Sequence, residues 1–355
     1  MNQLEAILNE YAVVTIEAPA DIVSKYAHLR ISANTPIAKP RTILSINGVQ
    51  IATPGNIVAI SGAPKTGKTA ITGSILSGSI CTSNGYDGCP LIQVAENVNR
   101  KAVIAIDTEQ SSYHNYNNLK HGVLKRAQLD CEPDNLFSYN IRELSFSQYK
   151  RFADEIFYSA NELCGGVHLA VIDGIADFIS SVNDEAEANS ILEYFAHLSI
   201  KYDTAIFLVV HLNPGSDKER GHLGSQLQRK CESVLTIKKD GDVSILEGKF
   251  LRSGSISDCQ AIQYKFDTNK GYHTFLGDAP RKNGNELKQL AETIFSVPRK
   301  YVDAVKLVME EQACKDRTAK QRITDMLNAD LLAKSVVDGS TYYSLKNIPD
   351  DYIPF

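Results

Sequence analysis

A glycine-rich segment at residues 62–69 has the residue types and the spacing that bind phosphate groups. It follows the pattern Gly62-x-x-x-x-Gly67-Lys68-Thr69. The glycines let the backbone curl so that its N–H groups face phosphate oxygens, and the positive end of the following helix adds to the attraction. Lys68 would then reach the β- and γ-phosphates of a nucleoside triphosphate, and the hydroxyl of Thr69 would ligate Mg²⁺. The predicted ATP-binding residues are Gly62, Ala63, Pro64, Lys65, Thr66, Gly67, Lys68, Thr69 and Ala70.

Two apolar runs end in carboxylic acids, which a phosphate-bound Mg²⁺ and an attacking water both need. One run ends at Asp173, and another ends at Asp107 and Glu109, which are separated by one residue. We expect Asp173 to hold Mg²⁺ through water, and Glu109 to be the general base that activates a water for attack on the γ-phosphate. Two plainer interpretations stay open. Asp173 could cap the next turn, and the second pair could supply the N-cap and the first-turn carboxylate of a helix.

These residues need a scaffold that places the ends of several strands side by side. The apolar run at 56–61 precedes the glycine-rich segment and a helical pattern begins at Lys68, so a chance glycine-rich turn is the weaker interpretation. Further apolar runs alternate with helical patterns, which predicts an α/β fold with a mostly parallel sheet and crossover helices. The runs lie at 102–107, 135–140, 167–173, 205–211 and 232–237, and the helical patterns lie near 112–127, 146–162 and 184–200. Alternating segments at 242–251 and 260–266 predict an antiparallel extension.

Composition shifts divide the chain into three parts. Residues 1–45 combine a short helical pattern with proline-containing segments and form a lead-in arm, and residues 46–276 form the ATP-binding domain. A break rich in Gly, Lys and Asn at 277–285 predicts a linker. In the last part, 286–355, three helical patterns precede two strands joined by an Asp338-Gly339 turn, which predicts a small winged-helix-like domain.

The strand end Ile106-Asp107-Thr108-Glu109 resembles that of the RecA family of ATPases, and the likeness extends over residues 46–266. Three further segments resemble the RepA- and DnaB-type hexameric helicase ATPases of plasmids and integrative elements. They are Val-Ile-Asp-Gly-Ile-Ala-Asp-Phe at 171–178, Val-Val-His-Leu-Asn-Pro at 209–214 and Arg-Gly-His-Leu-Gly-Ser at 220–225. The resemblance implies a RecA-like P-loop core, Glu109 as the catalytic base, and a homo-oligomeric, hexameric ring.

The same resemblance assigns a role to His211 and to the loop after it. His211 matches a position whose polar side chain senses the γ-phosphate, and the loop 213–230 matches a DNA-binding loop. Its basic residues suit contacts to a nucleic-acid backbone, although Asp217 and Glu219 dilute the charge and leave a solvated loop as the alternative. The basic residues are Lys218, Arg220, Arg229 and Lys230.

Lys249 and Arg252 resemble the Lys-x-Arg pair that hexameric members insert into a neighbour's nucleotide site. Arg252 would then be an arginine finger that offsets the charge of the transition state in trans. The spacing is one residue wider than the usual pattern, and strand residues three apart face opposite sides of a sheet. An exposed strand with two charges is therefore the alternative.

In the C-terminal part, residues 318–328 would be the recognition helix of the winged-helix-like domain. Two adjacent acids close to the C-terminus, Asp350 and Asp351, oppose a nearby phosphate, and no dense stripe of Lys and Arg is present. DNA contact and protein docking both stay open for this domain. Its candidate DNA contacts are Lys320, Gln321, Arg322 and Lys334.

Bulk properties narrow the function classes. A formal charge of −5 and a pI near 5.9 argue against a protein that coats nucleic acid through overall positive charge. The seven cysteines include no C-x-x-C pair, which fits reduced thiols and disfavours a zinc site. No signal-like segment begins the chain, and no stretch approaches the roughly 18 apolar residues of a membrane span. We therefore expect a soluble, cytoplasmic protein with no membrane partner.

Together these patterns predict an ATP-hydrolysing, nucleic-acid-dependent ATPase of the RecA type. We expect a helicase-like role in replication or mobilisation of a plasmid or integrative element, with single-stranded DNA as the partner. The alternative is an ATP-driven regulatory switch or assembly factor that docks a protein partner without translocating DNA. A small-molecule kinase is disfavoured because no segment resembles a lid with paired arginines.

Overall fold

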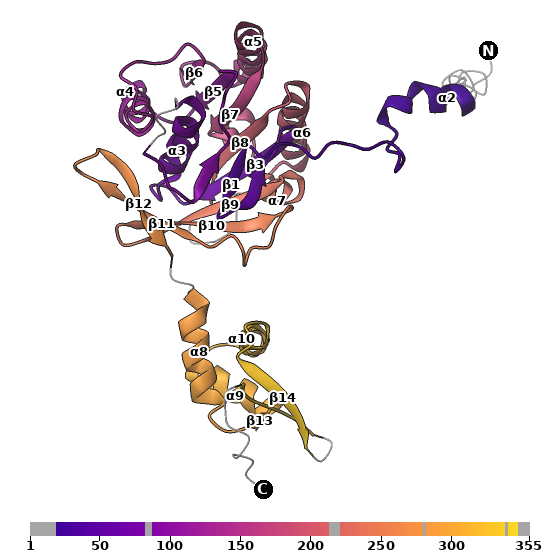
Figure 1. The fold of residues 1–355 in the computed structure, drawn as a ribbon, viewed down its shortest axis with the longest axis vertical. Helices are drawn as coiled ribbons and strands as arrows, with labels where there is room; N and C mark the ends of the chain where they lie inside the picture. The colour runs from indigo at the N-terminus through magenta and orange to yellow at the C-terminus, as the bar shows by residue number, and fades with distance from the viewer. Residues whose placement is uncertain (1–18, 82–86, 213–220, 280–281, 338–339, 347–355) are drawn as a thin grey trace, which may run out of the picture. The chain divides into compact units, whose positions relative to one another are not determined.

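The computed structural model describes residues 19–81, 87–212, 221–279, 282–337 and 340–346 (Figure 1). The chain divides into compact units at Met1–Pro40 and Arg41–Phe355. The first unit contains helix α2 (Pro19–Lys25) and the short 3₁₀ helix η1 (Ala27–Leu29). The lead-in arm predicted at 1–45 overlaps this unit, and its first 18 residues lie outside the described ranges.

Within the described residues, nine strands form one sheet in the order β12-β11-β10-β9-β3-β8-β7-β5-β6. The six strands from β9 to β6 pair in parallel, and β10, β11 and β12 add an antiparallel extension. This confirms the predicted α/β fold with a mostly parallel sheet. The parallel strands are β3 (Asn56–Gly62), β5 (Ala102–Asp107), β6 (Leu136–Asn140), β7 (Val167–Asp173), β8 (Ala205–His211) and β9 (Ser233–Asp240). The antiparallel strands are β10 (Val243–Leu251), β11 (Ile262–Asp267) and β12 (Tyr272–Asp278).

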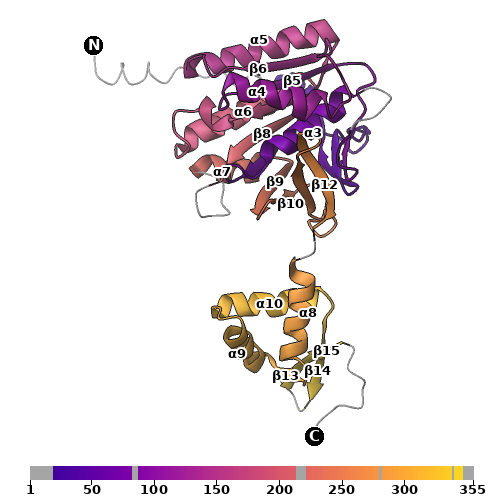
Figure 2. The ribbon, with the colours of Figure 1, turned by 90° about the vertical axis from the view of Figure 1, so that its left-hand side faces the viewer.

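Helices cover both faces of this sheet (Figures 1 and 2). One face packs against helix α3 (Lys68–Ile80) and the π-helix η2 (Asn118–Leu124), and the other packs against α5 (Phe146–Cys164) and α6 (Glu185–Lys201). A small second sheet, in the order β2-β1-β4, joins the α3 side of the core. It comprises β1 (Leu44–Ile46), β2 (Val49–Ala52) and β4 (Ile92–Val94). None of the helices in the described ranges is both long and apolar enough to cross a membrane.

Helix α5 shows how local sequence fixes these elements. Ser145 and Gln148 form a capping box at its start, and Gly165 ends it in a left-handed conformation with φ of 64°. Its buried side chains recur every three or four residues and therefore lie on one face. They are Tyr149, Ala153, Phe157 and Ala160.

Two elements that border the site differ from the sequence expectation. The single helix expected at 112–127 is a short helix α4 (Ser112–Asn117) that continues into the π-helix η2, because a 3.6-residue pattern does not distinguish the wider turn. Strand β12 was not predicted, and it takes up residues 277 and 278 of the expected linker. Its register is fixed by pairing with β11, in which Gly277 lies opposite Gln263.

The C-terminal elements form a separate core of their own. Helices α8 (Lys282–Ile294), α9 (Tyr301–Glu311) and α10 (Asp316–Asn328) accompany a sheet in the order β13-β15-β14. Its strands are β13 (Arg299–Lys300), β14 (Leu332–Val337) and β15 (Ser340–Leu345). Helices and a hairpin are thus present as expected, while the turn at residues 338–339 lies outside the described ranges. The winged-helix assignment stays a prediction.

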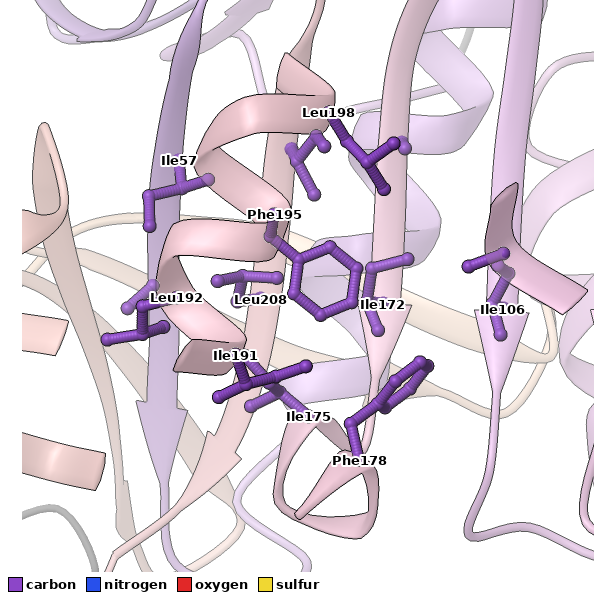
Figure 3. Close-up of a cluster of buried hydrophobic side chains, with 14 of the residues drawn as sticks. Ile57, Ile106, Ile172, Ile175, Phe178, Ile191, Leu192, Phe195, Leu198 and Leu208 are labelled. Atoms are coloured by element: carbon purple, nitrogen blue, oxygen red, sulfur yellow. The ribbon is translucent and has the colours of Figure 1, made fainter. Parts of the chain in front are cut away.

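The ring of Phe195 on α6 lies in the middle of the larger core cluster. Figure 3 shows it between Leu208 of β8 and Ile172 of β7, with Phe178 nearby. The Phe178 and Phe195 rings are 5.3 Å apart in an edge-to-face arrangement, which is a favourable aromatic geometry. This cluster joins α6 to the strands whose ends carry the acidic residues.

Replacing Phe195 with alanine is expected to lower the free energy of unfolding by about 3–5 kcal/mol, because it removes a fully buried ring and leaves a cavity. Urea unfolding followed by circular dichroism measures this change. Tyr158→Ala on α5 is the control, since that side chain is 60% exposed and should change stability by less than about 0.5 kcal/mol. Equal effects of the two substitutions would contradict the assignment of this core.

Candidate active site

Strand β3 and helix α3 hold the glycine-rich loop between them, and two glycines are required there. Gly67 has a left-handed φ of 97°, and a Cβ at this position would lie 2.8 Å from Oγ of Ser244. A Cβ at Gly62 would lie 2.7 Å from Oγ1 of Thr66 and 2.8 Å from the carbonyl oxygen of Ile237. Both positions therefore exclude a side chain, and the loop keeps the close curl that a phosphate cradle needs.

The antiparallel extension supports this loop. Tyr264 of β11 donates a hydrogen bond from its hydroxyl to the carbonyl oxygen of Gly67, at 3.2 Å. The phenol is buried, and burial raises the pKa of Tyr264 above its ordinary value, with a hydrogen bond to Ser244 opposing the change. The hydroxyl therefore stays protonated and remains a donor to the loop at any physiological pH.

Lys68, the first residue of α3, is buried against the loop. Its ammonium donates to the carbonyl oxygens of Gly62 at 2.9 Å and Ala63 at 3.0 Å. Burial lowers the pKa of Lys68, while the negative charges of Asp173 and Glu109 oppose that change. The cation is thus anchored by the loop and attracted by the acids around it.

Lys68, His211 and Glu109 form one hydrogen-bonded chain. The Lys68 ammonium contacts Nδ1 of His211 at 3.1 Å, and Nε2 of His211 contacts Oε2 of Glu109 at 2.8 Å. An ammonium can only donate, so Nδ1 accepts and Nε2 carries the proton that is donated to Glu109. The hydrogen bond from His211 lowers the pKa of Glu109, so this residue is a carboxylate at neutral pH. The ends of β5 and β8 and the start of α3 therefore bring three sequence-predicted residues together.

Asp107 organises the turn that carries Glu109. Its Oδ1 accepts hydrogen bonds from the main-chain N–H groups of Glu109 at 3.0 Å and Gln110 at 2.8 Å, and its Oδ2 accepts from the side chain of Gln110 at 2.7 Å. Helix α4 is capped by Ser111, whose hydroxyl accepts from the N–H of His114. The interpretation of Asp107 and Glu109 as the cap and first-turn acid of a helix is therefore wrong.

Asp173 lies directly beside Asp107 because β5 and β7 pair in register at these residues. Burial raises the pKa of Asp173 to about 7, and repulsion from the carboxylates of Asp107 and Glu109 contributes to the increase. The short helix that follows, η3 (Ile175–Phe178), has Gly174 as its N-cap. The structure thus disfavours a capping role for Asp173 and leaves its negative charge without full compensation.

Thr69 and Asp173, the residues predicted to hold Mg²⁺, both line the same pocket, and their role as ligands stays a prediction. In the part of the chain that the structure describes, no group of three or more His, Cys, Asp or Glu side chains is arranged to hold a metal ion. Mg²⁺ usually takes one or two carboxylates together with phosphate oxygens and waters rather than a complete protein cage. A threonine hydroxyl and an undercompensated carboxylate that line one pocket are donors of the kind that Mg²⁺ takes together with a nucleotide.

A pocket of about 770 Å³ opens beside the loop. One part of its wall comes from the β11–β12 hairpin and is aromatic: Phe266, Tyr272 and His273. Burial lowers the pKa of His273, helped by nearby Arg126 and Lys239, so this imidazole is neutral at pH 7. Other lining residues come from α3, α4 and η2. They include Thr72, Gly73, Asn115, Asn117, Asn118 and His121.

This pocket wall was missed by sequence reasoning. Its hairpin lies far along the chain, and β12 was not predicted at all. The available signal was weak: an alternating segment that ends in the aromatic residue Phe266. In the fold, Phe266 stands out because this large apolar residue lines the pocket and is still 48% exposed.

The structure does not bring Arg252 to the loop of its own chain. Leu251, the last residue of β10, pairs with Ser233 at the start of β9, while the loop lies at the opposite end, after β3. The Arg252 guanidinium donates to the carbonyl oxygens of Arg229 and Cys231, both at 3.3 Å. Its role as a finger for a neighbouring subunit stays a prediction.

Lys249 lies at a β-bulge, because the pairing of β10 with β9 skips from Gly248 to Phe250. The bulge interrupts the two-residue alternation, so residue spacing alone does not decide whether Lys249 and Arg252 share a face. Of the predicted DNA-binding loop, Lys218 and Arg220 lie outside the described residues.

Two other basic residues of that loop lie on helix α7 (Gly221–Lys230). The ammonium of Lys230 forms an ion pair with Glu193 at 2.9 Å. Arg229 donates a weak hydrogen bond to the side chain of Gln226 at 3.4 Å. Both cations therefore have partners within the chain.

Replacing Asp173 with asparagine should stabilise the nucleotide-free protein. The folded-state pKa of about 7 exceeds the ordinary value of 3.8, so ionising this carboxyl costs stability as pH rises from about 4 to about 7, and the full cost is present at pH 8. The substitution should raise the free energy of unfolding at pH 8 by up to about 4 kcal/mol, and by less at pH 5.5. Thermal unfolding at both pH values tests this, with exposed Asp134→Asn as the control. A loss of stability at pH 8 would show that the folded protein does not disfavour the ionised form of Asp173.

Comparison with known proteins agrees with this geometry. The family model described as AAA domain matches residues 35–217, which contain the glycine-rich loop and the strand ends that carry Glu109, Asp173 and His211. Among curated proteins, none matches the chain. The family is one of P-loop ATPases, and it implies binding of a nucleotide and usually of Mg²⁺. Because the match covers just over half of the sequence, this protein belongs to the AAA-domain family of P-loop ATPases.

Proposed function

We propose that this protein binds MgATP and hydrolyses it as a nucleic-acid-dependent ATPase of the RecA type, with a helicase-like role in replication or mobilisation of a plasmid or integrative element. The observation that carries the ATPase proposal is the hydrogen-bonded chain from Lys68 through His211 to Glu109, with Asp173 beside it. It joins a cation for the γ-phosphate to a carboxylate that can take a proton from water.

Hydrolysis would follow from these positions. A water oxygen forms a bond to the γ-phosphorus while the bond to the β,γ-bridging oxygen breaks, and ADP leaves with that electron pair. Glu109 takes the proton of the water, and Lys68 offsets the charge on the phosphate oxygens. Thr69 and Asp173 would hold a Mg²⁺ ion, which would supply further charge compensation.

His211 links this chemistry to the occupancy of the site. The Nε2–H of His211 is donated to Glu109. A γ-phosphate close to Lys68 offers the same N–H a second, more highly charged acceptor. The imidazole would then release Glu109 to a water when the triphosphate is present, which is a sensing role of the kind that the RecA resemblance implies.

The pocket beside the loop is the place for the nucleoside. In its aromatic wall, the half-exposed ring of Phe266 offers a face on which a base can stack, and the amide side chains of Asn115, Asn117 and Asn118 offer donors and acceptors for base and ribose. The pocket shares Thr69 and Asp173 with the Mg²⁺ site. One ligand can therefore reach both the phosphate cradle and the aromatic wall.

Nucleic acid and ring assembly are supported by the helicase-like segments of the sequence and by Arg252, which lies away from the loop of its own chain. A second candidate is an ATP-driven switch that docks a protein. It is favoured by the partners that Lys230 and Arg229 already have within the chain, since paired cations hold a phosphate backbone less strongly.

Replacing Glu109 with glutamine should lower the rate of ATP hydrolysis by about 10²- to 10⁴-fold, because the amide cannot take the proton of water. ATP affinity should be retained, whereas Lys68→Ala should remove it. Phosphate release and binding of a fluorescent ATP analogue measure the two quantities. Glu162→Gln, an exposed change on α5, serves as the matched control. Full activity of the Glu109 variant would exclude it as the base.

Single-stranded DNA should raise the ATPase rate several-fold, and DNA together with a non-hydrolysable ATP analogue should increase the mass in solution. The stimulation should weaken at high salt, since phosphate contacts release counterions. A base-free polyanion of similar charge density is the control for non-specific binding. If DNA leaves the ATPase rate unchanged and a protein partner raises it, the helicase-like role is rejected in favour of the switch.

A further inference from the structure

Gln110, the residue after the proposed base, is held from three sides. Its Nε2 donates to Oδ2 of Asp107 at 2.7 Å, and its Oε1 accepts from Nδ2 of Asn118 at 2.5 Å. Its main-chain carbonyl oxygen accepts from Asn140 at 2.8 Å. A carboxylate can only accept, so the NH₂ group of Gln110 must face Asp107 and its oxygen must face Asn118. The side chain therefore has one orientation and connects the Glu109 turn to the start of η2.

The other end of η2 is clamped between two distant elements. Ser77 of α3 donates to the carbonyl oxygen of Val123 at 2.9 Å. Arg126, which is buried, donates to the carbonyl oxygens of Gly122 at 3.2 Å and of His273 on β12 at 2.9 Å. This end of the segment is thus fixed to the core, and its first residue is joined to the catalytic turn.

The π-helix lies along the pocket between these two attachments. Asn118, His121 and Val123 all line it, together with Thr69 and Asp173. A π-helical turn within a helix often marks a functional position, because it costs stability relative to a regular turn. A ligand that fills this pocket touches the segment that is hydrogen-bonded to the turn of Glu109.

We propose that Asn118 and Gln110 are positioning residues that make the placement of Glu109 depend on a nucleoside in the pocket. The inference rests on the proposed function, because it assigns the pocket to the nucleoside of the hydrolysed triphosphate. A nucleoside packed on η2 favours the arrangement in which Asn118 holds Gln110, and that arrangement holds the Glu109 turn. Such coupling requires the ligand to bind one arrangement better than the other. The nucleoside therefore contributes to turnover as well as to affinity.

Inorganic tripolyphosphate tests the coupling because it has the phosphates of ATP and lacks the nucleoside. The wild-type protein should have a higher kcat with ATP than with tripolyphosphate, both with Mg²⁺. Asn118→Ala should lower the ratio of these two kcat values about tenfold, the effect of losing one hydrogen bond of this strength, with a smaller change in the KM for ATP. Hydrogen exchange gives a second readout: the ATP analogue should protect amides of residues 107–112 in the wild type and much less in the variant.

Lys120→Ala is the matched control. Lys120 lies on the same π-helix, its side chain is exposed, and its ammonium lies over the ring of Tyr116, outside the residues that line the pocket. Its substitution should leave the KM for ATP and the kcat ratio within about twofold of the wild type, because no bond to the catalytic turn is lost. Gln110→Glu is a second variant that keeps the size of the side chain and places a carboxylate against Asp107. It should lower the same ratio, whether or not Asn118→Ala folds.

The proposal is overturned if Asn118→Ala and Gln110→Glu change the kcat ratio no more than Lys120→Ala does. It is also overturned if the wild type turns over tripolyphosphate as fast as ATP. Either result leaves ATP hydrolysis intact, so the proposed function would survive. If the wild type hydrolyses neither compound with or without single-stranded DNA, the proposed function itself is rejected, and the coupling with it.

Discussion

The buried ammonium of Lys68 is the interaction on which the site depends. Two loop carbonyl oxygens anchor it, the charges of Asp173 and Glu109 attract it, and its third contact fixes the tautomer of His211. Because the tautomer decides which atom faces Glu109, one cation controls the loop, the imidazole and the carboxylate together. Residues linked in this way rarely have additive effects. The energetic contributions of Lys68, His211 and Glu109 must therefore be measured with double and triple substitutions rather than with single ones.

The acids around this cation differ in how far their negative charge is compensated by neighbouring groups. Asp107 is saturated by donors from the turn that follows it, whereas Asp173 faces two like charges in a half-buried position. A divalent cation that enters with a phosphate would relieve this repulsion, so the site would bind it more favourably than a site without the repulsion. The same repulsion lowers the stability of the empty protein, which is the usual relation between stability and activity at functional sites.

The predicted parts of the site share one property: their signals are local in the sequence. The loop at 62–69 and the strand ends at Glu109, Asp173 and His211 each follow an apolar run, and parallel pairing then brings such ends to one edge of the sheet. The α/β fold was predictable for the same reason. The aromatic wall depends on how β12 pairs with β11, which no local pattern encodes. The π-helix escaped because its apolar spacing resembles that of a regular helix. Helicase activity, the ring and the winged helix concern partners and finer classification, and they stay predictions.

The contact between Tyr264 and Gly67 bears on what counts as a complete catalytic unit. The family match ends at residue 217, yet the loop rests on Tyr264, and the space for a Cβ at Gly67 is taken by Ser244. A fragment limited to the matched region would keep the glycine-rich loop and the strand ends with Glu109, Asp173 and His211. It would lose Ser244 and Tyr264, which support the loop from behind. A truncation or recombination within strands β10 and β11 would therefore disturb the phosphate-binding loop although residues 62–69 are unchanged. The smallest unit that keeps the loop in place is longer than the region that the family model matches.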